Sequence, residues 1–322
     1  MFAALSPSTA IAVENGKSAA GDPNAVAISG YASGFLYSPR MVFTAAHVAT
    51  APGPSLYIEL PGATKNGGKE TIKVQKVLVA PTYKDRTSEK VSRIDDFAIL
   101  ILEKPVPMKN HVVVASQSQM NQFIDQGVKA SLVGYGFQSA QQRSDFQGKP
   151  LVINPAIMET KFIPKTEVEN ILAKSLLKFM TYTYLDAGFS QVPGSASICD
   201  NDSGAGFFVQ DGADRIYIGA VGGLVWGIPN CGQQSGWDPN GAVAMVTGAF
   251  RFSDLIKEAE TFVASDSASK NSVSPSPTPS QTTAITSSPT VKTIKISCSN
   301  GKTKKYVVGI NPSCPPGYKK TK

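Results

Sequence analysis

Three segments of this 322-residue chain carry side chains suited to acid, base or nucleophilic chemistry. His47 follows an apolar run and two alanines. Asp95 and Asp96 stand directly before the apolar run 97–102. Ser203 lies among small and polar residues in the run 199–206. An imidazole, a carboxylate and an alcohol are the groups that acyl-transfer chemistry requires.

Each segment also has an ordinary structural interpretation. A single histidine such as His47 is often a packing residue, and an acidic pair before a strand is often a solvated turn. The acidic run 200–202 resembles the start of a calcium loop, but the later ligands of an EF-hand are absent. The chemical interpretations are a carboxylate that fixes an imidazole tautomer, and a serine turn whose backbone N–H groups converge on one point.

The elements that would position these groups are predominantly β-strands. Residues 13–263 contain many short β-rich runs separated by Gly, Pro, Asn and Asp clusters, which predicts an antiparallel barrel or sandwich. Helical spacing of apolar residues predicts one helix near 167–179 and a second that opens at Ser253 or Asp254, with Ser253 as a suitable N-cap. At 42% hydrophobic residues the chain can bury a core, and no run of about 18 apolar residues is present.

Together the three segments resemble the sequence boxes of the chymotrypsin-like (trypsin family) serine proteases. The run 43–48, FTAAHV, is similar to the family's T-A-A-H-C, and 199–206, CDNDSGAG, is similar to C-x-G-D-S-G-G-P. The run 95–102, DDFAILIL, is similar to D-I-A-L-L, which selects Asp96 over Asp95. The resemblance covers about residues 13–263. It implies an all-β fold, a double six-stranded antiparallel β-barrel with a C-terminal helix.

The resemblance also implies the role of each residue. Ser203 would be the nucleophile, His47 the general base and then acid, and Asp96 the orienting carboxylate, while the backbone N–H groups of Asn201 and Ser203 would form the oxyanion hole. The expected function is a secreted serine endopeptidase that works through an acyl-enzyme. The alternatives are a catalytically weak or inactive protease-like domain that binds without cutting, and an esterase that uses the same groups.

Three departures from the family pattern affect this site. Asn201 replaces a glycine where φ is usually positive, and Asn is the non-glycine residue that tolerates this conformation best. Val48 replaces a cysteine whose partner position is Ala32, so apolar packing must hold the histidine segment. Val225 stands where the family usually has a serine that bonds the triad carboxylate, so Asp96 needs other donors, such as backbone N–H groups. Asn201 and Val225 motivate the inactive alternative.

The resemblance places the specificity pocket around five residues. Ser197 lies at the position that carries an aspartate in proteases selective for Lys or Arg, and its neutral side chain removes that charge. Gly227 and Gly241 would keep the pocket walls open, next to Val225 and Trp226. We therefore expect cleavage after medium or large apolar or aromatic residues.

The N-terminal region resembles a cleaved leader followed by a mature start. Residues 1–12 are apolar and end in Ala10-Ile11-Ala12, a small-x-small pattern typical of signal-peptide cleavage, which makes them the expected remnant of a signal peptide. The family's freed α-amino group pairs with the aspartate before the nucleophile. By resemblance, Val13 and Asp202 form this activation pair.

The four cysteines allow three pairings. Family resemblance and segment separation favour the bridges Cys199–Cys231 and Cys298–Cys314, which would persist in an oxidising compartment. With only two histidines, His47 and His111, the sequence contains no zinc-type ligand cluster, and we expect no metal and no cofactor. His111 is expected to be a bystander in a loop.

The C-terminal part differs in composition from the rest. Residues 264–291 are Ser/Thr/Pro-rich and predict a linker. Residues 292–322 contain eight lysines and no Asp or Glu, so this segment has a net charge of +8. Since the whole chain has a net charge of +7, residues 1–291 have a net charge of −1. The dipeptide Asn300-Gly301 predicts a two-residue hairpin. The segment resembles short basic Cys-containing modules on exported actinobacterial proteins.

These features set the expected partners and location. We expect a polypeptide substrate. The basic tail suits weak attachment to an anionic cell-wall polymer or membrane surface, and the alternative is a solubilising appendage. We expect no nucleic-acid partner, because the tail lacks interleaved aromatics. The chain is expected to be a secreted monomer, with the tail as its means of association with the cell surface.

Overall fold

The computed structural model describes most of the chain, namely residues 13, 15–51, 53, 55–63, 70–85, 94–137, 153–174, 186–191, 195–226, 242–271, 294–299, 301, 304–309, 314 and 318–321. The chain divides into two compact units, Met1–Ser272 and Val273–Lys322. The sequence predicted the boundary after residue 263, and the first unit is longer because its last helix continues past that point.

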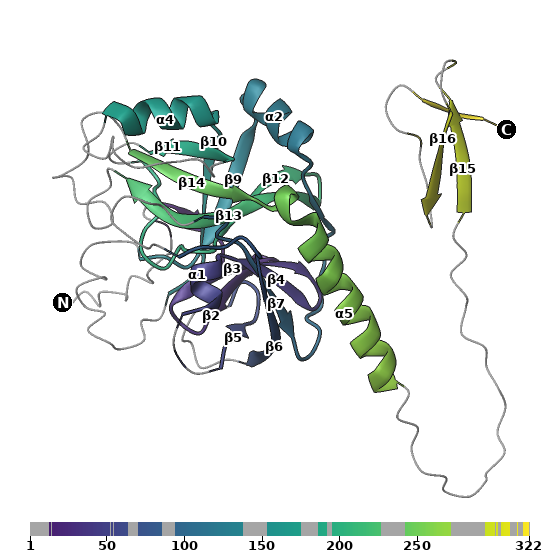
Figure 1. Ribbon diagram of the computed structural model, residues 1–322, viewed down its shortest axis with the longest axis horizontal. Helices are drawn as coiled ribbons and strands as arrows, with labels where there is room; N and C mark the ends of the chain where they lie inside the picture. Colours follow the sequence, from purple (N-terminus) through teal and green to yellow (C-terminus); the bar gives the residue numbers. More distant parts are fainter. Residues whose placement is uncertain are drawn as a thin grey trace, which may run out of the picture. The chain divides into compact units, whose positions relative to one another are not determined.

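A closed six-stranded barrel forms the first half of the first unit (Figure 1). Its strands follow the order β2-β3-β4-β7-β6-β5, and every neighbouring pair is antiparallel. They are β2 (Ala25–Ile28), β3 (Ala32–Ser38), β4 (Met41–Thr44), β5 (Tyr57–Glu59), β6 (Thr71–Val79) and β7 (Ala98–Leu102). The one-turn helix α1 (Ala46–Ala49) follows β4 and carries His47.

An eight-stranded sheet forms the second half. Its order is β1-β10-β9-β12-β13-β14-β11, and β8 adds to β13 as a parallel strand. The strands are β1 (Lys17–Ser18), β8 (Val112–Val114), β9 (Lys129–Gly134), β10 (Ala156–Lys161), β11 (Ala187–Gln191), β12 (Gly206–Asp211), β13 (Asp214–Trp226) and β14 (Ala242–Gly248). The predicted all-β fold is confirmed. In this half, six strands in the order β10-β9-β12-β13-β14-β11 pair antiparallel, and the short strands β1 and β8 extend the sheet.

Besides α1, the described residues form the helices α2 (Gln117–Asp125), α4 (Lys165–Lys174) and α5 (Ser253–Asn271) and the 3-10 helix η1 (Ala249–Phe252). The two predicted helices correspond to α4 and α5. Ser253 is not an N-cap, since η1 runs directly into α5 and Ser253 already has helical dihedrals. The start of the expected linker, residues 264–271, is helical instead of extended.

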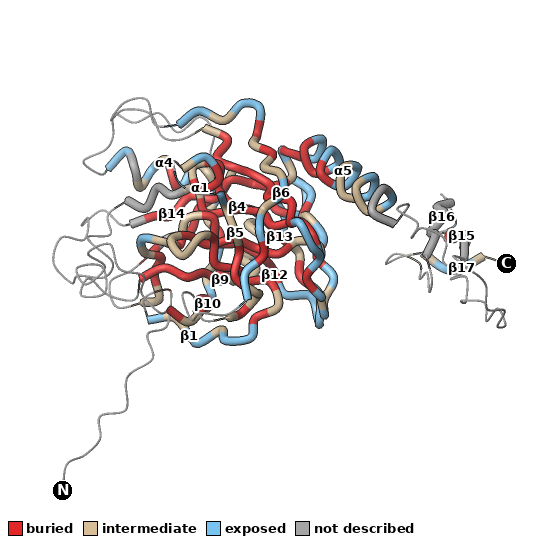
Figure 2. Tube along the Cα trace, turned by 90° about the horizontal axis from the view of Figure 1, so that it is seen from below, coloured by how far each residue is buried: buried red, intermediate tan, exposed pale blue. Residues whose placement is uncertain are grey.

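One buried core runs through both halves, as the red tube at the centre of Figure 2 shows. It is rich in aromatic rings, with Phe43 within 5.2 Å of both Phe97 and Tyr217, measured between ring centroids. A second cluster fills the first barrel and includes Val48 and Ala32, which are 2% and 1% exposed. Apolar packing therefore holds the histidine segment, as the sequence predicted.

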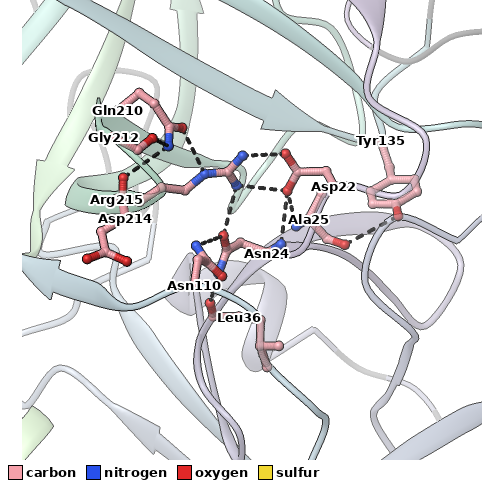
Figure 3. Close-up of polar contacts among 10 residues, drawn as sticks. All are labelled: Asp22, Asn24, Ala25, Leu36, Asn110, Tyr135, Gln210, Gly212, Asp214 and Arg215. Atoms are coloured by element: carbon pink, nitrogen blue, oxygen red, sulfur yellow. Dashed lines mark hydrogen bonds and ion pairs between the residues drawn. The ribbon is translucent and has the colours of Figure 1, made fainter.

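A buried ion pair also joins the two halves (Figure 3). Arg215, on β13, donates Nη2 to Asp22 Oδ2 at 2.6 Å and Nη1 to Asp22 Oδ1 at 2.8 Å. Asp22 Oδ1 also accepts from the backbone N–H groups of Asn24 and Ala25, at the start of β2. The pair thus fixes the entry of the first barrel against the second sheet.

The C-terminal unit contains a three-stranded sheet of order β16-β15-β17. Its strands are β15 (Ile294–Ser299), β16 (Lys304–Gly309) and β17 (Lys319–Thr321). Cys298 and Cys314 form the predicted disulfide. The two-residue hairpin is wrong, because Ser299 pairs with Lys304 and four residues lie between them. Gly301 has φ +88° and supplies the left-handed turn conformation.

Among the described residues, none of the helices combines the length and the apolar character that a membrane crossing requires.

Candidate active site

His47 and Asp96 form a hydrogen-bonded pair at the ends of two adjacent strands of the barrel, with His47 on α1 after β4 and Asp96 just before β7. Phe43 on β4 pairs with Ile99 on β7, so the residues that follow one strand lie beside those that precede the other. The ring Nδ1 of His47 lies 2.7 Å from Asp96 Oδ2, and the backbone N–H of His47 donates to Asp96 Oδ1 at 2.9 Å. Both carboxylate oxygens thus have partners, as the sequence required once Val225 had replaced the usual serine.

The neighbouring Asp95 belongs to a different system. It has φ +50° and receives a hydrogen bond from Thr82 Oγ1, while its Oδ1 lies 2.8 Å from Arg251 Nη1. Arg251 also lies 3.6 Å from Asp186 Oδ2. Burial raises the pKa of Asp186 to about 6. The hydrogen bond from the Gly248 N–H and the charge of Arg251 lower this pKa in part, and the nearby Asp95 carboxylate raises it further. The choice of Asp96 over Asp95 as the partner of the imidazole agrees with this geometry.

Ser203 lies in a loop in which Asn201 and Gly204 both have left-handed backbones, with φ of +76° and +82°. The positive φ predicted for Asn201 is therefore confirmed. Gly204 cannot carry a side chain without strain, because a Cβ there would overlap Thr44 Oγ1 and the carbonyl oxygen of Ser33 and lie 3.0 Å from the backbone nitrogen of Ala45. The loop is thus packed against the segment that leads into His47.

Asp202 is completely buried, and its carboxylate links the Ser203 loop to neighbouring backbone N–H groups. Its Oδ1 accepts from the Gly136 N–H at 2.7 Å, and its Oδ2 accepts from the Cys199 N–H at 2.9 Å. A Cβ at Gly134 or Gly136 would overlap the Asp202 carboxyl group. The two glycines of the run 132–136 therefore make room for a buried carboxylate.

The remaining predicted residues have mixed outcomes. Ser197 is fully buried, and Val13 is buried in the main core with its carbonyl accepting from the Gly16 N–H. Cys199 is disulfide-bonded. Val225 and Trp226 belong to β13. Gly227, Cys231 and Gly241 lie outside the described residues, so the pocket walls remain a prediction.

Comparisons with known proteins agree on one family. The trypsin family model matches residues 15–250. Trypsin 5G1 of Aedes aegypti is 27% identical over 210 residues, which are 65% of this chain and 69% of that protein. The chain belongs to the trypsin family. The C-terminal unit lies outside the matched residues, and its resemblance to actinobacterial modules stays an expectation.

Ser33 is a buried polar residue of the trypsin-family domain that lies next to the Ser203 loop and that the sequence did not single out. Ser33, on β3, is fully buried and contacts Asn201, Ser203, Thr44 and Tyr135 through hydrogen bonds. The small residues at 32–34 in an otherwise apolar strand were the available signal, because small residues in a strand allow another backbone to approach closely.

No group of three or more His, Cys, Asp or Glu that would hold a metal ion occurs in the described part of the trypsin-family domain or of the C-terminal unit.

Proposed function

We propose that this chain is a serine endopeptidase with His47, Asp96 and Ser203 as its catalytic residues. The observation that carries the proposal is the double contact between His47 and Asp96. A carboxylate that accepts the Nδ1–H leaves Nε2 of the neutral ring as the free base, and it stabilises the imidazolium that forms when the ring takes a proton. The backbone bond to Asp96 Oδ1 holds the carboxylate in this orientation.

The proposed reaction has two steps. His47 Nε2 removes the proton of Ser203 Oγ as the oxygen attacks the substrate carbonyl carbon, and the resulting negative oxygen accepts from the N–H groups of Asn201 and Ser203. His47 then gives the proton to the nitrogen of the leaving amine. The C–N bond breaks, the amine departs, and the acyl group stays bound to Ser203 Oγ as an acyl-enzyme. Water, activated by His47, attacks this ester and releases the acid.

A fluorophosphonate probe tests the proposal directly. Such a probe phosphonylates a serine only where a base and an oxyanion site activate it, so the wild type should label and Ser203→Ala should not. Unlabelled wild type that still binds polypeptide would favour the protease-like binding domain instead. A labelled protein that cleaves peptide esters but no peptide amides would favour an esterase.

The substrate preference is a second part of the proposal. Ser197 is fully buried and uncharged, so a pocket built on it offers no partner to an Arg or Lys side chain. We expect cleavage after apolar or aromatic residues, as peptide-library profiling would reveal. A strong preference for Arg or Lys would refute the assignment of Ser197 to the pocket.

Activation, export and attachment complete the proposal. Removal of residues 1–12 would free an amine at Val13 to pair with Asp202, and N-terminal sequencing of mature protein identifies the start. The disulfide between Cys298 and Cys314 suits an oxidising, extracellular location. The lysine-rich C-terminal unit would bind anionic surfaces, with an affinity that falls as salt rises.

A further inference from the structure

Ser33 is hydrogen-bonded to both residues that would supply the oxyanion hole. Its hydroxyl donates to the carbonyl oxygen of Asn201 at 2.7 Å, and its backbone N–H donates to the carbonyl oxygen of Ser203 at 3.0 Å. Ser33 belongs to β3 of the first barrel, 168 residues before Asn201. We propose that Ser33 is a positioning residue that holds the oxyanion loop in its productive conformation, an inference that rests on the proposed function.

The hydroxyl of Ser33 is itself fixed at both ends. It accepts from the backbone N–H of Tyr135 at 2.8 Å while it donates to Asn201, and the Ser33 carbonyl accepts from Thr44 Oγ1 at 2.9 Å. The residue is fully buried, so water does not compete for these bonds. A hydroxyl with one donor and one acceptor partner has a single orientation here, which makes it a rigid support.

The peptide units of the loop are otherwise held by backbone bonds. The carbonyl of Asp200, which shares a peptide plane with the Asn201 N–H, accepts from the Phe137 N–H at 2.9 Å. The carbonyl of Asp202, which shares a plane with the Ser203 N–H, accepts from the Ala205 N–H at 2.8 Å. The peptide between these two donor planes is bonded on both sides. Its N–H, on Asp202, donates to the Cys199 carbonyl oxygen at 3.1 Å, and its carbonyl, on Asn201, accepts from Ser33 Oγ.

The backbone of Asn201 explains why such a support matters. At φ +76° a non-glycine residue is strained and tends to relax toward negative φ. That relaxation would rotate the peptide planes on either side of Cα and turn the Asn201 N–H away from the point it shares with the Ser203 N–H. The Ser33–Asn201 bond opposes this rotation. Ser33 therefore compensates for an asparagine at a position that favours glycine.

Removal of the hydroxyl should impair transition-state binding more than substrate binding. In Ser33→Ala both side-chain bonds are lost and the backbone bond to Ser203 remains. We expect kcat on a peptide ester to fall about 10- to 100-fold, somewhat less than the 10²- to 10³-fold typical of deleting an oxyanion donor, with KM within about threefold. Affinity for a peptide aldehyde, which forms a tetrahedral oxyanion, should fall by the same factor as kcat.

Ser116→Ala is the matched control. Ser116 caps α2 through a bond from the Gln119 N–H at 3.2 Å, outside the oxyanion loop, and its loss should also lower the thermal midpoint by about 2–4 °C. Its kcat and aldehyde affinity should match the wild type. If Ser33→Ala does not fold, Ser33→Cys replaces it, because the thiol has a similar size and is a weaker donor. It should lower kcat with KM unchanged.

The outcomes separate the inference from the proposed function. A wild type that fails to label with the fluorophosphonate overturns both. A wild type that labels, together with Ser33 variants whose kcat stays within about threefold of Ser116→Ala, overturns the positioning role alone. A loss of kcat without any loss of aldehyde affinity also overturns it, because the effect would then lie outside the oxyanion site.

Discussion

Asp95 and Asp96 are adjacent in the sequence, but their carboxylates bind different partners. Asp96 is 1% exposed and accepts two hydrogen bonds from His47, whereas Asp95 turns the other way and pairs with Thr82 and Arg251. Asp95 has a positive φ, and its carbonyl accepts from the Phe97 N–H at 2.7 Å, so the chain bends between these residues just before β7. One carboxylate is thereby available to the imidazole while its neighbour stabilises the turn.

Substitution at these two positions should separate catalysis from stability. Asp96→Asn replaces the acceptor of the His47 Nδ1–H with an amide that favours the wrong tautomer, and we expect kcat to fall about 10⁴-fold with little change in the thermal midpoint. Asp95→Asn should lower the thermal midpoint and keep most of kcat, since its partners lie away from His47. Steady-state kinetics and thermal unfolding measure both. Equal kinetic losses in the two variants would contradict this division.

Gly204 is the position at which close approach is most demanding. We expect Gly204→Ala to destabilise the protein by about 3 kcal/mol, because it combines left-handed strain with overlap onto Thr44 and Ser33. Gly212→Ala is the control, since Gly212 has φ +61° and nothing lies within 4 Å of a Cβ there. It should cost only about 1 kcal/mol. Urea unfolding gives both values, and equal costs would show that the overlap is relieved by movement.

The sequence predicts the individual residues of the proposed site but not their support. His47, Asp96 and Ser203 stand in recognisable local runs, and the positive φ of Asn201 follows from its replacement of glycine. Ser33 has no such run around it. Its importance arises from contacts with a segment 168 residues away, which only the folded chain brings together.

Some helix boundaries in this chain are set by local sequence signals, and others are set by tertiary contacts. Helix α2 carries a full capping box, Ser116 with Gln119, that local inspection of the sequence could have found. The end of α5 could not be found in this way. Residues 264–271 have linker-like composition, yet the buried Arg40 holds them in the helix by pairing with Asp266 at 2.7 Å and donating to Ser267 Oγ at 3.3 Å.

Asp186 directly precedes β11, and its carboxyl group accepts from the Gly248 N–H where β14 meets η1. The burial of this carboxyl group should make stability depend on pH. The pKa of Asp186 is raised to about 6 from 3.8, so between these values the folded protein binds a proton that the unfolded chain has released. Stability must therefore fall at this site as pH rises from about 4 to about 6. Asp186→Asn cannot show this fall.

Urea unfolding from pH 4 to pH 7 measures the effect. The stability of the wild type relative to Asp186→Asn should decline by up to about 3 kcal/mol across this range. Asparagine keeps an oxygen that can accept from the Gly248 N–H, which Asp186 Oδ2 accepts at 2.8 Å, so the variant should fold. Parallel pH profiles for the two proteins would contradict the raised pKa.

At the scale of the whole first unit, the proposed site depends on two halves that contribute different groups. His47 and Asp96 come from the closed barrel, and the loop of Ser203 precedes β12 of the second sheet. The shared aromatic core and the Asp22–Arg215 pair fix the two halves against each other. The geometry of the proposed site thus depends on the junction as much as on the residues that line it.

Arg215→Met should reveal how much that junction contributes. The substitution keeps packing volume and leaves the Asp22 carboxylate buried with only its backbone donors, so we expect a loss of about 3–5 kcal/mol. Lys129→Met removes an exposed partner of Glu159 and should cost less than about 1 kcal/mol. The double variant Asp22→Asn, Arg215→Met should recover part of the loss, because it removes the uncompensated charge. Urea unfolding of the wild type, the two single variants and the double variant measures these differences. A double variant less stable than Arg215→Met alone would show that Asp22 acts chiefly through the backbone of Asn24 and Ala25.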